Sequence, residues 1–311
     1  MQIGVDWGGT SIKLAIIDGR NVSSFISRPT TGTPEQILDT IASAVKELAV
    51  KPDRVGLAIP GEVKASGECW RLPNVPGFEG VNIGAELTKR LGCPVAVEND
   101  ANAAALAERL FGWGIQYRCM LLVTLGTGVG GGFVLDGNIR RGRGGFAGEI
   151  GHFVIDYSEN ARDCGCGNRG CLEAYAGSDG LLALEHSLGG SADSIKQAFV
   201  GPHVDAVLKQ LGSSLGKALA SINNTLDLDA IVFTGGVAGS LDRFIDYIKH
   251  EMNCRSFSDS QSEVFMLSSQ LGEHAGVIGA ANLPQKTESR QDGFSSPSLF
   301  SGPIIRDDGL E

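Results

Sequence analysis

The segment Gly142–Tyr175, GRGGFAGEIGHFVIDYSENARDCGCGNRGCLEAY, contains a metal-ligand pattern. Three cysteines and one histidine lie close together in it: His152, Cys164, Cys166 and Cys171. One imidazole and three thiolates are a full tetrahedral set for a closed structural zinc site. The glycines between the cysteines allow the tight turns that such closely spaced ligands need. The segment therefore predicts a zinc ion held by these four side chains.

Disulfide bonds are the alternative for these cysteines. Cys164 and Cys166 are separated by one residue, which makes them awkward partners for each other. Residues 1–20 contain several charged residues and no long apolar core, so we expect no signal peptide and a cytoplasmic protein. In a reducing compartment, clustered cysteines are expected to bind metals rather than to form bridges. We therefore favour zinc.

The composition is typical of a globular enzyme. The chain of 311 residues has room for two domains and a substantial core. Its formal net charge of −10 argues against a nucleic-acid partner, because binding to a phosphate backbone needs a basic surface. No apolar run reaches the ~18–20 residues of a membrane span. Its 44 glycines predict many tight turns and loops that approach a ligand closely.

One order of elements occurs twice along the chain: strand, glycine loop, strand and Asp-Gly turn. The first copy is Ile3–Asp6, Gly8-Gly9-Thr10, Ile12–Ile17 and Asp18-Gly19, and the second is Leu121–Leu125, Gly126–Gly132, Phe133–Leu135 and Asp136-Gly137. The Asp-Gly pairs favour type I′ hairpins. The period is too long for a solenoid, so it predicts two related lobes whose glycine-rich hairpins point into a shared cleft.

Hydrophobic periodicity predicts the remaining elements. We expect helices at Pro34–Ala49, Ala101–Phe111, Val204–Leu226, from about Ser240 and at His274–Asn282, and strands at Val55–Ile59, Val95–Val97, Ala230–Phe233 and Val264–Leu267. From Pro284 onward the composition shifts to Ser, Pro, Gly, Asp and Lys, which predicts a disordered tail over residues 287–311.

The glycine loops predict a nucleotide site, because phosphates need closely approaching backbone N–H groups, hydroxyls and a few charges. A lone glycine loop is often only a tight turn, but two matching loops and a third glycine pair are stronger. Neither loop is a Walker A sequence. The residues expected at the nucleotide are Asp6, Gly8, Gly9, Thr10, Ser11, Lys13, Gly126, Thr127, Gly128, Gly130, Gly131, Gly235 and Gly236.

Taken together, these motifs resemble the ROK family of sugar kinases and repressors, within the actin/hexokinase-like ATPase fold. The resemblance covers roughly residues 2–283 and rests on Asp6–Thr10, Glu98–Asn102, Gly126–Gly132, Gly142–His152, Cys164–Glu173 and Thr234–Val237. Trp7 and Ser11 depart from the family pattern, and we expect Trp7 to face the core or the underside of its loop.

The resemblance implies an α/β fold of two actin-like (ribonuclease H-like) lobes with a central cleft. The smaller lobe would comprise residues 1–111, completed by 272–286. The larger lobe, residues 112–271, would carry the Cys3His zinc site.

The resemblance also implies phosphoryl transfer from ATP to a hexose. Asp100 matches the general base, which accepts the proton of the sugar hydroxyl as that oxygen attacks the γ-phosphate. An aspartate before a helix is also a common N-cap, so capping is the alternative for Asp100. Mg²⁺ would be held mainly by the ATP phosphates and by Asp6, although an aspartate at this position can instead anchor the loop.

Several residues match the family's hexose ligands. They are Asn99, Asp100, Glu149, His152 and Glu173, with Gly61 and Asn74 at the border of the sugar. One ring nitrogen of His152 can bind zinc while the other, as N–H, donates to a sugar hydroxyl. Zinc would then be structural, with no open coordination position.

These features favour an ATP-dependent kinase that phosphorylates a glucose-type sugar at its 6-hydroxyl, with glucose favoured and a homodimer as the family expectation. N-acetylglucosamine, N-acetylmannosamine, allose and fructose kinases share the motifs. A sugar-responsive repressor would carry a DNA-binding module of about 60–80 residues ahead of this domain, and we expect none because the first strand begins at Ile3. Asp100 and the glycine loops argue against a third possibility, a non-catalytic relative that only binds sugar.

Overall fold

The computed structural model describes residues 1–48, 51–64, 66–73, 75–258 and 263–284. The expectations for Asn74, for residues 285–286 and for the tail 287–311 lie outside the described residues.

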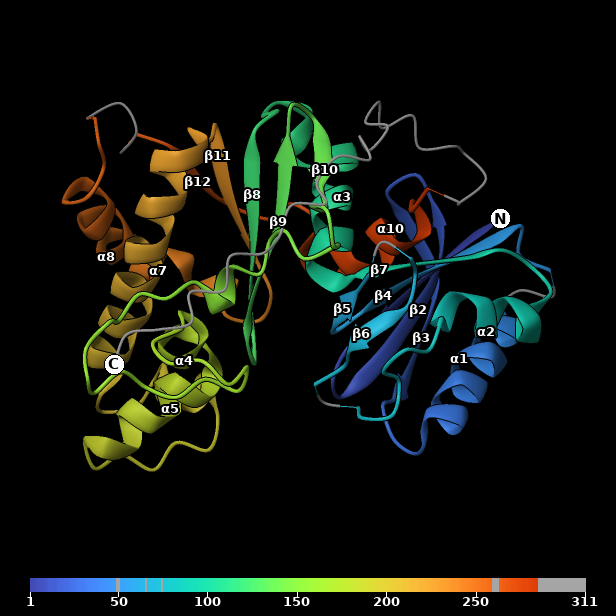
Figure 1. Ribbon diagram of the computed structural model, residues 1–311, viewed down its shortest axis with the longest axis horizontal. Helices are drawn as coiled ribbons and strands as arrows, with labels where there is room; N and C mark the ends of the chain where they lie inside the picture. Colours follow the sequence, from blue (N-terminus) through green and yellow to red (C-terminus); the bar gives the residue numbers. More distant parts are fainter. Residues whose placement is uncertain (49–50, 65, 74, 259–262, 285–311) are drawn as a thin grey trace, which may run out of the picture.

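Two five-stranded sheets have the same strand order and directions (Figure 1). The first sheet runs β3 (Asn21–Pro29), β2 (Ser11–Asp18), β1 (Gln2–Trp7), β4 (Arg54–Ile59), β7 (Val95–Asn99), and the second β10 (Asn138–Arg140), β9 (Val129–Leu135), β8 (Met120–Leu125), β11 (Ala230–Thr234), β12 (Phe265–Ser268). In each sheet, the central strand pairs antiparallel with its hairpin partner and parallel with the strand on its other side. These pairs are β1 with β2 and β4, and β8 with β9 and β11. This shared topology explains the repeat in the sequence.

The two Asp-Gly turns differ in type. Leu135 pairs with Asn138, and both Asp136 and Gly137 have positive φ, as the predicted type I′ turn requires. In the first sheet Asp18 pairs with Asn21, so the loop residues are Gly19 and Arg20. Only Gly19 has positive φ there, which is the type II′ pattern, and the type I′ prediction for this turn is wrong.

Helices cover the outer faces of the sheets and fill the space between them. The helices are α1 (Pro34–Leu48), α2 (Ile83–Leu91), α3 (Asp100–Phe111), α4 (Glu173–Ala176), α5 (Ser178–Ser187), α6 (Ile195–Ala198), α7 (Val204–Leu226), α8 (Leu241–Asn253) and α10 (Ala275–Ala281). Short 3-10 turns are η1 (Trp113–Ile115), η2 (Ile150–His152), η3 (Ala238–Ser240) and η4 (Gly272–His274), and β5 (Glu62–Val63) and β6 (Cys69–Arg71) form a small hairpin.

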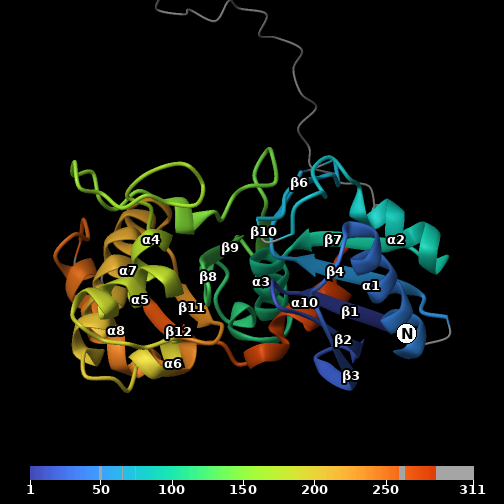
Figure 2. The same cartoon turned by 90° about the horizontal axis from the view of Figure 1, so that it is seen from below.

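Helices α3 and α10 lie between the two sheets in both views (Figures 1 and 2). Glycines let α10 rest directly on the first sheet, since a Cβ at Gly4 would lie 1.8 Å from the Val277 carbonyl oxygen. A Cβ at Gly56 would similarly lie 1.6 Å from the oxygen of Ala280. Side chains from both sheets and both helices share one apolar cluster there. The division into lobes at residues 111 and 271 stays a prediction.

Trp7 lies in the core, which is one of the two positions that the sequence predicted for it. Its side chain is fully buried and meets Phe78 edge to face, with ring centroids 5.2 Å apart. The outer core of the second sheet is formed by β8, β11, α7 and α8. Within the described ranges, none of the helices has the length and apolar character to span a membrane.

Candidate active site

Three parallel strands of the first sheet end at one edge. Asp6 on β1 pairs with Ala58 on β4, which pairs with Glu98 on β7. Carboxyl ends of parallel strands bring the residues that follow them together, and ligands bind in that crevice in open α/β sheets. Here these residues are the loop after Trp7, the turn at Gly61 and the start of α3. The predicted residues from distant parts of the chain therefore meet at this edge.

Asn99, and not Asp100, caps helix α3. The Asn99 side-chain oxygen accepts from the Asn102 backbone N–H at 3.1 Å, and its amide donates to the Gly61 carbonyl at 3.2 Å. Asp100 is the first residue of the helix, and its carboxylate accepts from the adjacent Ala101 N–H, at 2.8 Å, and from its own N–H. The capping alternative for Asp100 is thereby removed.

The Asp100 carboxylate lies in a part-buried and negatively charged environment. Loss of water, and after it the charge of Asp6, raises the pKa of Asp100 to about 7. Burial also raises the pKa of Asp6, which Lys13 opposes. A carboxylate with a pKa near neutrality is well matched to accept a proton at physiological pH, because catalytic pKa values work best near the operating pH.

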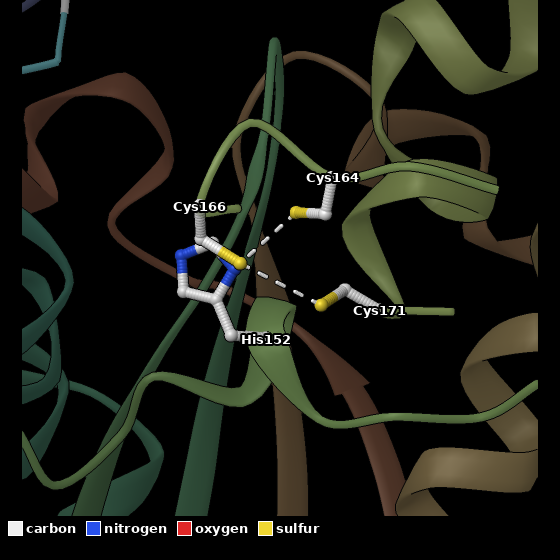
Figure 3. A group of neighbouring side chains, drawn as sticks. All are labelled: His152, Cys164, Cys166 and Cys171. Carbon is white, nitrogen blue, oxygen red and sulfur yellow. Dashed lines mark hydrogen bonds between the residues drawn. The ribbon is translucent and has the colours of Figure 1, made fainter. Parts of the chain in front are cut away.

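The four predicted zinc ligands converge (Figure 3). Their ligand atoms all lie within 4.8 Å of one another, with Cys164 Sγ 3.7 Å from His152 Nδ1 and Cys166 Sγ 3.8 Å from Cys171 Sγ. Zn–S bonds of about 2.3 Å and Zn–N bonds of about 2.0–2.1 Å at tetrahedral angles would place such atoms about 3.6–3.8 Å apart. None of the three cysteines forms a disulfide in the structure. The donor set and its spacing fit a tetrahedral zinc ion.

His152 also belongs to a second group of possible ligands. Its ring, Glu62 and Glu149 bring one nitrogen and two carboxylate oxygens within 4.8 Å of one another. Loss of water raises the pKa of Glu149 to about 7, and the charges of Glu62, Asp100 and Glu173 add to the shift. The imidazole thus lies between the thiol cluster and the acidic edge of the first sheet.

Glu173 connects the cysteine cluster to the second glycine loop. It follows Cys171 by two residues, begins α4, and accepts a hydrogen bond from the Val129 backbone N–H at 3.0 Å. A Cβ at Gly128 would lie 2.2 Å from its carboxylate, so a larger residue there would displace the carboxylate from this position. The family resemblance predicts Glu173 at the sugar; the structure adds a contact with the loop at residues 126–128.

The second and third glycine turns lie together, and the first is at the end of β1. Gly235 has a φ of +95° and lies against the Leu125 backbone, where Val237 N–H donates to the Leu125 carbonyl at 3.2 Å. At the first loop, Gly8 N–H donates to Ser11 across a tight turn at 2.8 Å. Gly9 and Thr10 are exposed at the tip of that turn.

Sequence reasoning missed Glu62 and Arg71. Glu62 is buried on β5, and Arg71 faces it from β6 with Nε 3.8 Å from the carboxylate. The available signal was a charged residue directly after Pro60-Gly61, at the end of an apolar strand. A second ion pair, between Arg141 and Glu98, ties the loop before Gly142 to strand β7.

The comparisons with known proteins agree with this geometry. The model of the ROK family matches residues 2–287. A glucokinase of Streptomyces coelicolor is 32% identical over 93% of this chain and 98% of its own, and an N-acetyl-D-glucosamine kinase of Pasteurella multocida is 32% identical over 91% and 99%. The structure of a Streptomyces griseus ROK glucokinase in complex with glucose and AMPPNP has a TM-score of 0.77, at 31% identity over 90% of this chain and 97% of that chain.

The raised pKa of Asp100 predicts how Asp100→Asn changes stability with pH. Between the ordinary value of 3.8 and about 7, the folded state holds a proton that the unfolded state releases. The wild type therefore loses stability as pH rises through this window, whereas asparagine has no charge to bury. Near pH 8 the variant should be more stable by about 1–3 kcal/mol, and the difference should vanish near pH 4.

Thermal or urea unfolding of the ligand-free protein across this pH range measures the effect. Asp179→Asn is the matched control, because Asp179 is an exposed aspartate in the first turn of α5 and should show no such gain. Equal stability of wild type and Asp100→Asn near pH 8 would contradict the assigned environment of Asp100.

Proposed function

The chain belongs to the ROK family, and we propose that it is an ATP-dependent hexose kinase that phosphorylates a glucose-type sugar at its 6-hydroxyl. The observation that carries this proposal is the Asp100 carboxylate, which is free of a capping role and has a pKa of about 7 beside Asp6 and Glu149. Sugar binding alone does not require a carboxylate with a pKa near neutrality, whereas a proton acceptor in phosphoryl transfer does.

In the proposed reaction the sugar oxygen attacks the γ-phosphorus of ATP. The new bond joins that oxygen to phosphorus, the bond from the γ-phosphorus to the β,γ-bridging oxygen breaks, and ADP leaves with the electron pair. Asp100 accepts the hydroxyl proton as the attack proceeds. The products are a hexose phosphate, ADP and a protonated carboxyl group that returns its proton to solvent. Proton transfer of this kind contributes about 10²–10⁴-fold to the rate.

The glycine turns are the proposed phosphate contacts. Backbone N–H groups at Gly9, Gly128 and Gly236 can approach an anion without obstruction by a side chain. The N–H groups of Gly8 and Gly126 donate to the carbonyls of Ser11 and Gly128 and shape the turns. Three kinds of group complete the set of phosphate contacts predicted from the sequence. They are the hydroxyls of Thr10, Ser11 and Thr127, the backbone of Gly130, Gly131 and Gly235, and the ammonium of Lys13. Lys13 pairs with the exposed Glu273 at 3.5 Å, a weak contact that a phosphate can replace.

Asp6 is the proposed protein ligand for Mg²⁺. Its part-buried carboxylate has a raised pKa and lies close enough to Asp100 to raise the pKa of that residue too. Oxygen donors of this kind suit Mg²⁺, which keeps most of its other positions for water and phosphate. Bound there, the ion would neutralise charge that develops on the transferred phosphoryl group.

Zinc is the proposed occupant of the Cys3His cluster. The tetrahedral spacing of one nitrogen and three sulfurs supports zinc, and four protein ligands leave no position for a reacting water. Zinc there would hold His152 in one orientation, so that its second nitrogen is fixed toward the sugar side. The role of the metal is therefore structural.

The proposed sugar site combines residues from both halves of the chain. Asn99, Asp100 and Gly61 come from the edge of the first sheet, and Glu149, His152 and Glu173 come from the segment around the cysteines. Glucose is favoured, and the 32% identity to both a glucokinase and an N-acetyl-D-glucosamine kinase keeps N-acetylhexosamines as alternatives. Allose and fructose are further candidates, and a homodimer in the cytoplasm completes the proposal.

A non-catalytic, sugar-responsive regulator is the second function that the family allows. Such a protein needs the hexose ligands but neither the proton acceptor nor the phosphate loops. ADP release over a panel of hexoses separates the two functions, because a regulator binds sugar without turnover.

Asp100→Asn should abolish phosphoryl transfer and leave hexose affinity within about tenfold of the wild type, because asparagine keeps the shape but cannot take the proton. A coupled ADP-release assay and calorimetric sugar binding measure the two quantities. Below about pH 7 the wild-type rate should fall as the Asp100 carboxylate becomes protonated. Wild-type turnover in the variant would show that another group is the base.

Cys166→Ser should lose both bound zinc and thermal stability, because three ligands no longer close the tetrahedron and the binding energy of a structural site is folding energy. Elemental analysis of the purified wild type should give about one zinc per chain. Cys254→Ser, in an exposed cysteine outside the cluster, should keep both properties. Active wild-type protein without zinc would overturn the assignment.

A further inference from the structure

Glu62 is a buried carboxylate with an unused oxygen. The residue is only 7% exposed, and its Oε2 has no hydrogen-bond partner in the described part of the chain. It lies on β5, two residues after Pro60 and beside Gly61, at the same edge of the first sheet as Asn99 and Asp100. The reaction steps derived above do not involve Glu62. Burying an ionised carboxylate without a hydrogen bond is costly, so the position calls for a donor.

Arg71 does not supply that donor. Its Nε lies 3.8 Å from Glu62 Oε2, which is too long for a hydrogen bond, and this Nε is itself without a hydrogen-bond partner among the residues described. The guanidinium carbon lies 5.7 Å from the centroid of the Trp70 ring, a cation–π distance. The arginine therefore forms a long ion pair with the carboxylate, and among the described residues this oxygen is left without a hydrogen-bond donor.

A second carboxylate faces the same space. Oxygens of Glu62 and Glu149 and a ring nitrogen of His152 all lie within 4.8 Å of one another. The two carboxylates at this spacing can share one small group that carries several donors. A neutral hydroxyl has a single O–H to offer, whereas an ammonium has three N–H donors and a positive charge. The repulsion between two carboxylates also favours a cation between them.

We propose that Glu62, together with Glu149, binds the ammonium group of an amino hexose, so that the kinase prefers a free amino sugar such as D-glucosamine to its N-acetylated form. The inference rests on the proposed hexose kinase function and names its substrate class. An N-acetyl group has no charge and one N–H, and it would leave the second carboxylate unpaired.

The test compares D-glucosamine, N-acetyl-D-glucosamine and D-glucose with the full-length, zinc-loaded protein. Assays run at about pH 7, below the ordinary pKa of an α-amino group, so that most of the amine is charged. Wild type should have a kcat/KM for D-glucosamine at least about tenfold above that for N-acetyl-D-glucosamine. Glu62→Gln should lower kcat/KM for D-glucosamine about 10- to 150-fold more than for D-glucose, the range for a hydrogen bond to a charged group.

Two further variants make the test specific to the charge at Glu62. Glu68→Gln, in the loop of the same hairpin, removes a half-exposed carboxylate that forms an ion pair with Lys64, and it should leave the ratio between the sugars unchanged. Arg71→Met removes the nearby positive charge and should increase the preference for D-glucosamine over D-glucose.

Binding measured by calorimetry without ATP separates this inference from the proposed function. Tighter binding of D-glucosamine than of N-acetyl-D-glucosamine, lost in Glu62→Gln, supports the amine site even if the protein transfers no phosphate. Equal binding of the two sugars, or equal losses for D-glucosamine and D-glucose in Glu62→Gln, overturns it. In that case a water or a sugar hydroxyl satisfies the Glu62 oxygen.

Discussion

The site depends on the position of the Cys3His cluster. The segment that precedes and contains these ligands has little regular structure, with one 3-10 turn at Ile150–His152 and isolated bridges such as Val154–Cys171. Backbone hydrogen bonds in turns, such as those from Ile155 to Gly170 and from Cys164 to Asn168, hold it together with the convergence of the four side chains. Glu149 and Glu173 flank this cluster in sequence. The position of the Cys3His cluster thus fixes the His152 ring, which is proposed to bind the sugar, and the Glu173 carboxylate, which contacts the second glycine loop.

The same site concentrates negative charge. Asp6 and Asp100 meet at the end of the first sheet, and Glu62 and Glu149 lie beside His152. Loss of water, and after it repulsion, raises the pKa of Asp100 and Glu149 to about 7, which costs stability in the ligand-free protein. Substrate hydroxyls, a metal ion or an ammonium would relieve that cost on binding. Strain of this kind is typical of functional sites, where activity opposes stability.

Local patterns predicted much of this molecule. The metal ligands lie within one short segment, and the repeat of strand, glycine loop and strand predicted matching hairpins, because both signals are contained in neighbouring residues. What failed depended on distant contacts or on weak patterns. Strand β3 is largely exposed and gave no apolar alternation, and the role of Asn99 as the cap became clear only from its hydrogen bonds. The role of Glu62 could not be predicted from the sequence, because only the folded chain brings it close to Glu149 and Arg71.

The central claim is that one imidazole serves both the zinc site and the sugar site. Zinc content and hexose affinity, measured together in His152→Ala and Glu149→Ala, test it most directly. The account predicts that His152→Ala loses zinc and weakens hexose binding, whereas Glu149→Ala keeps zinc and weakens hexose binding about 10- to 150-fold. Normal sugar binding by zinc-depleted His152→Ala, or loss of zinc from Glu149→Ala, would contradict it.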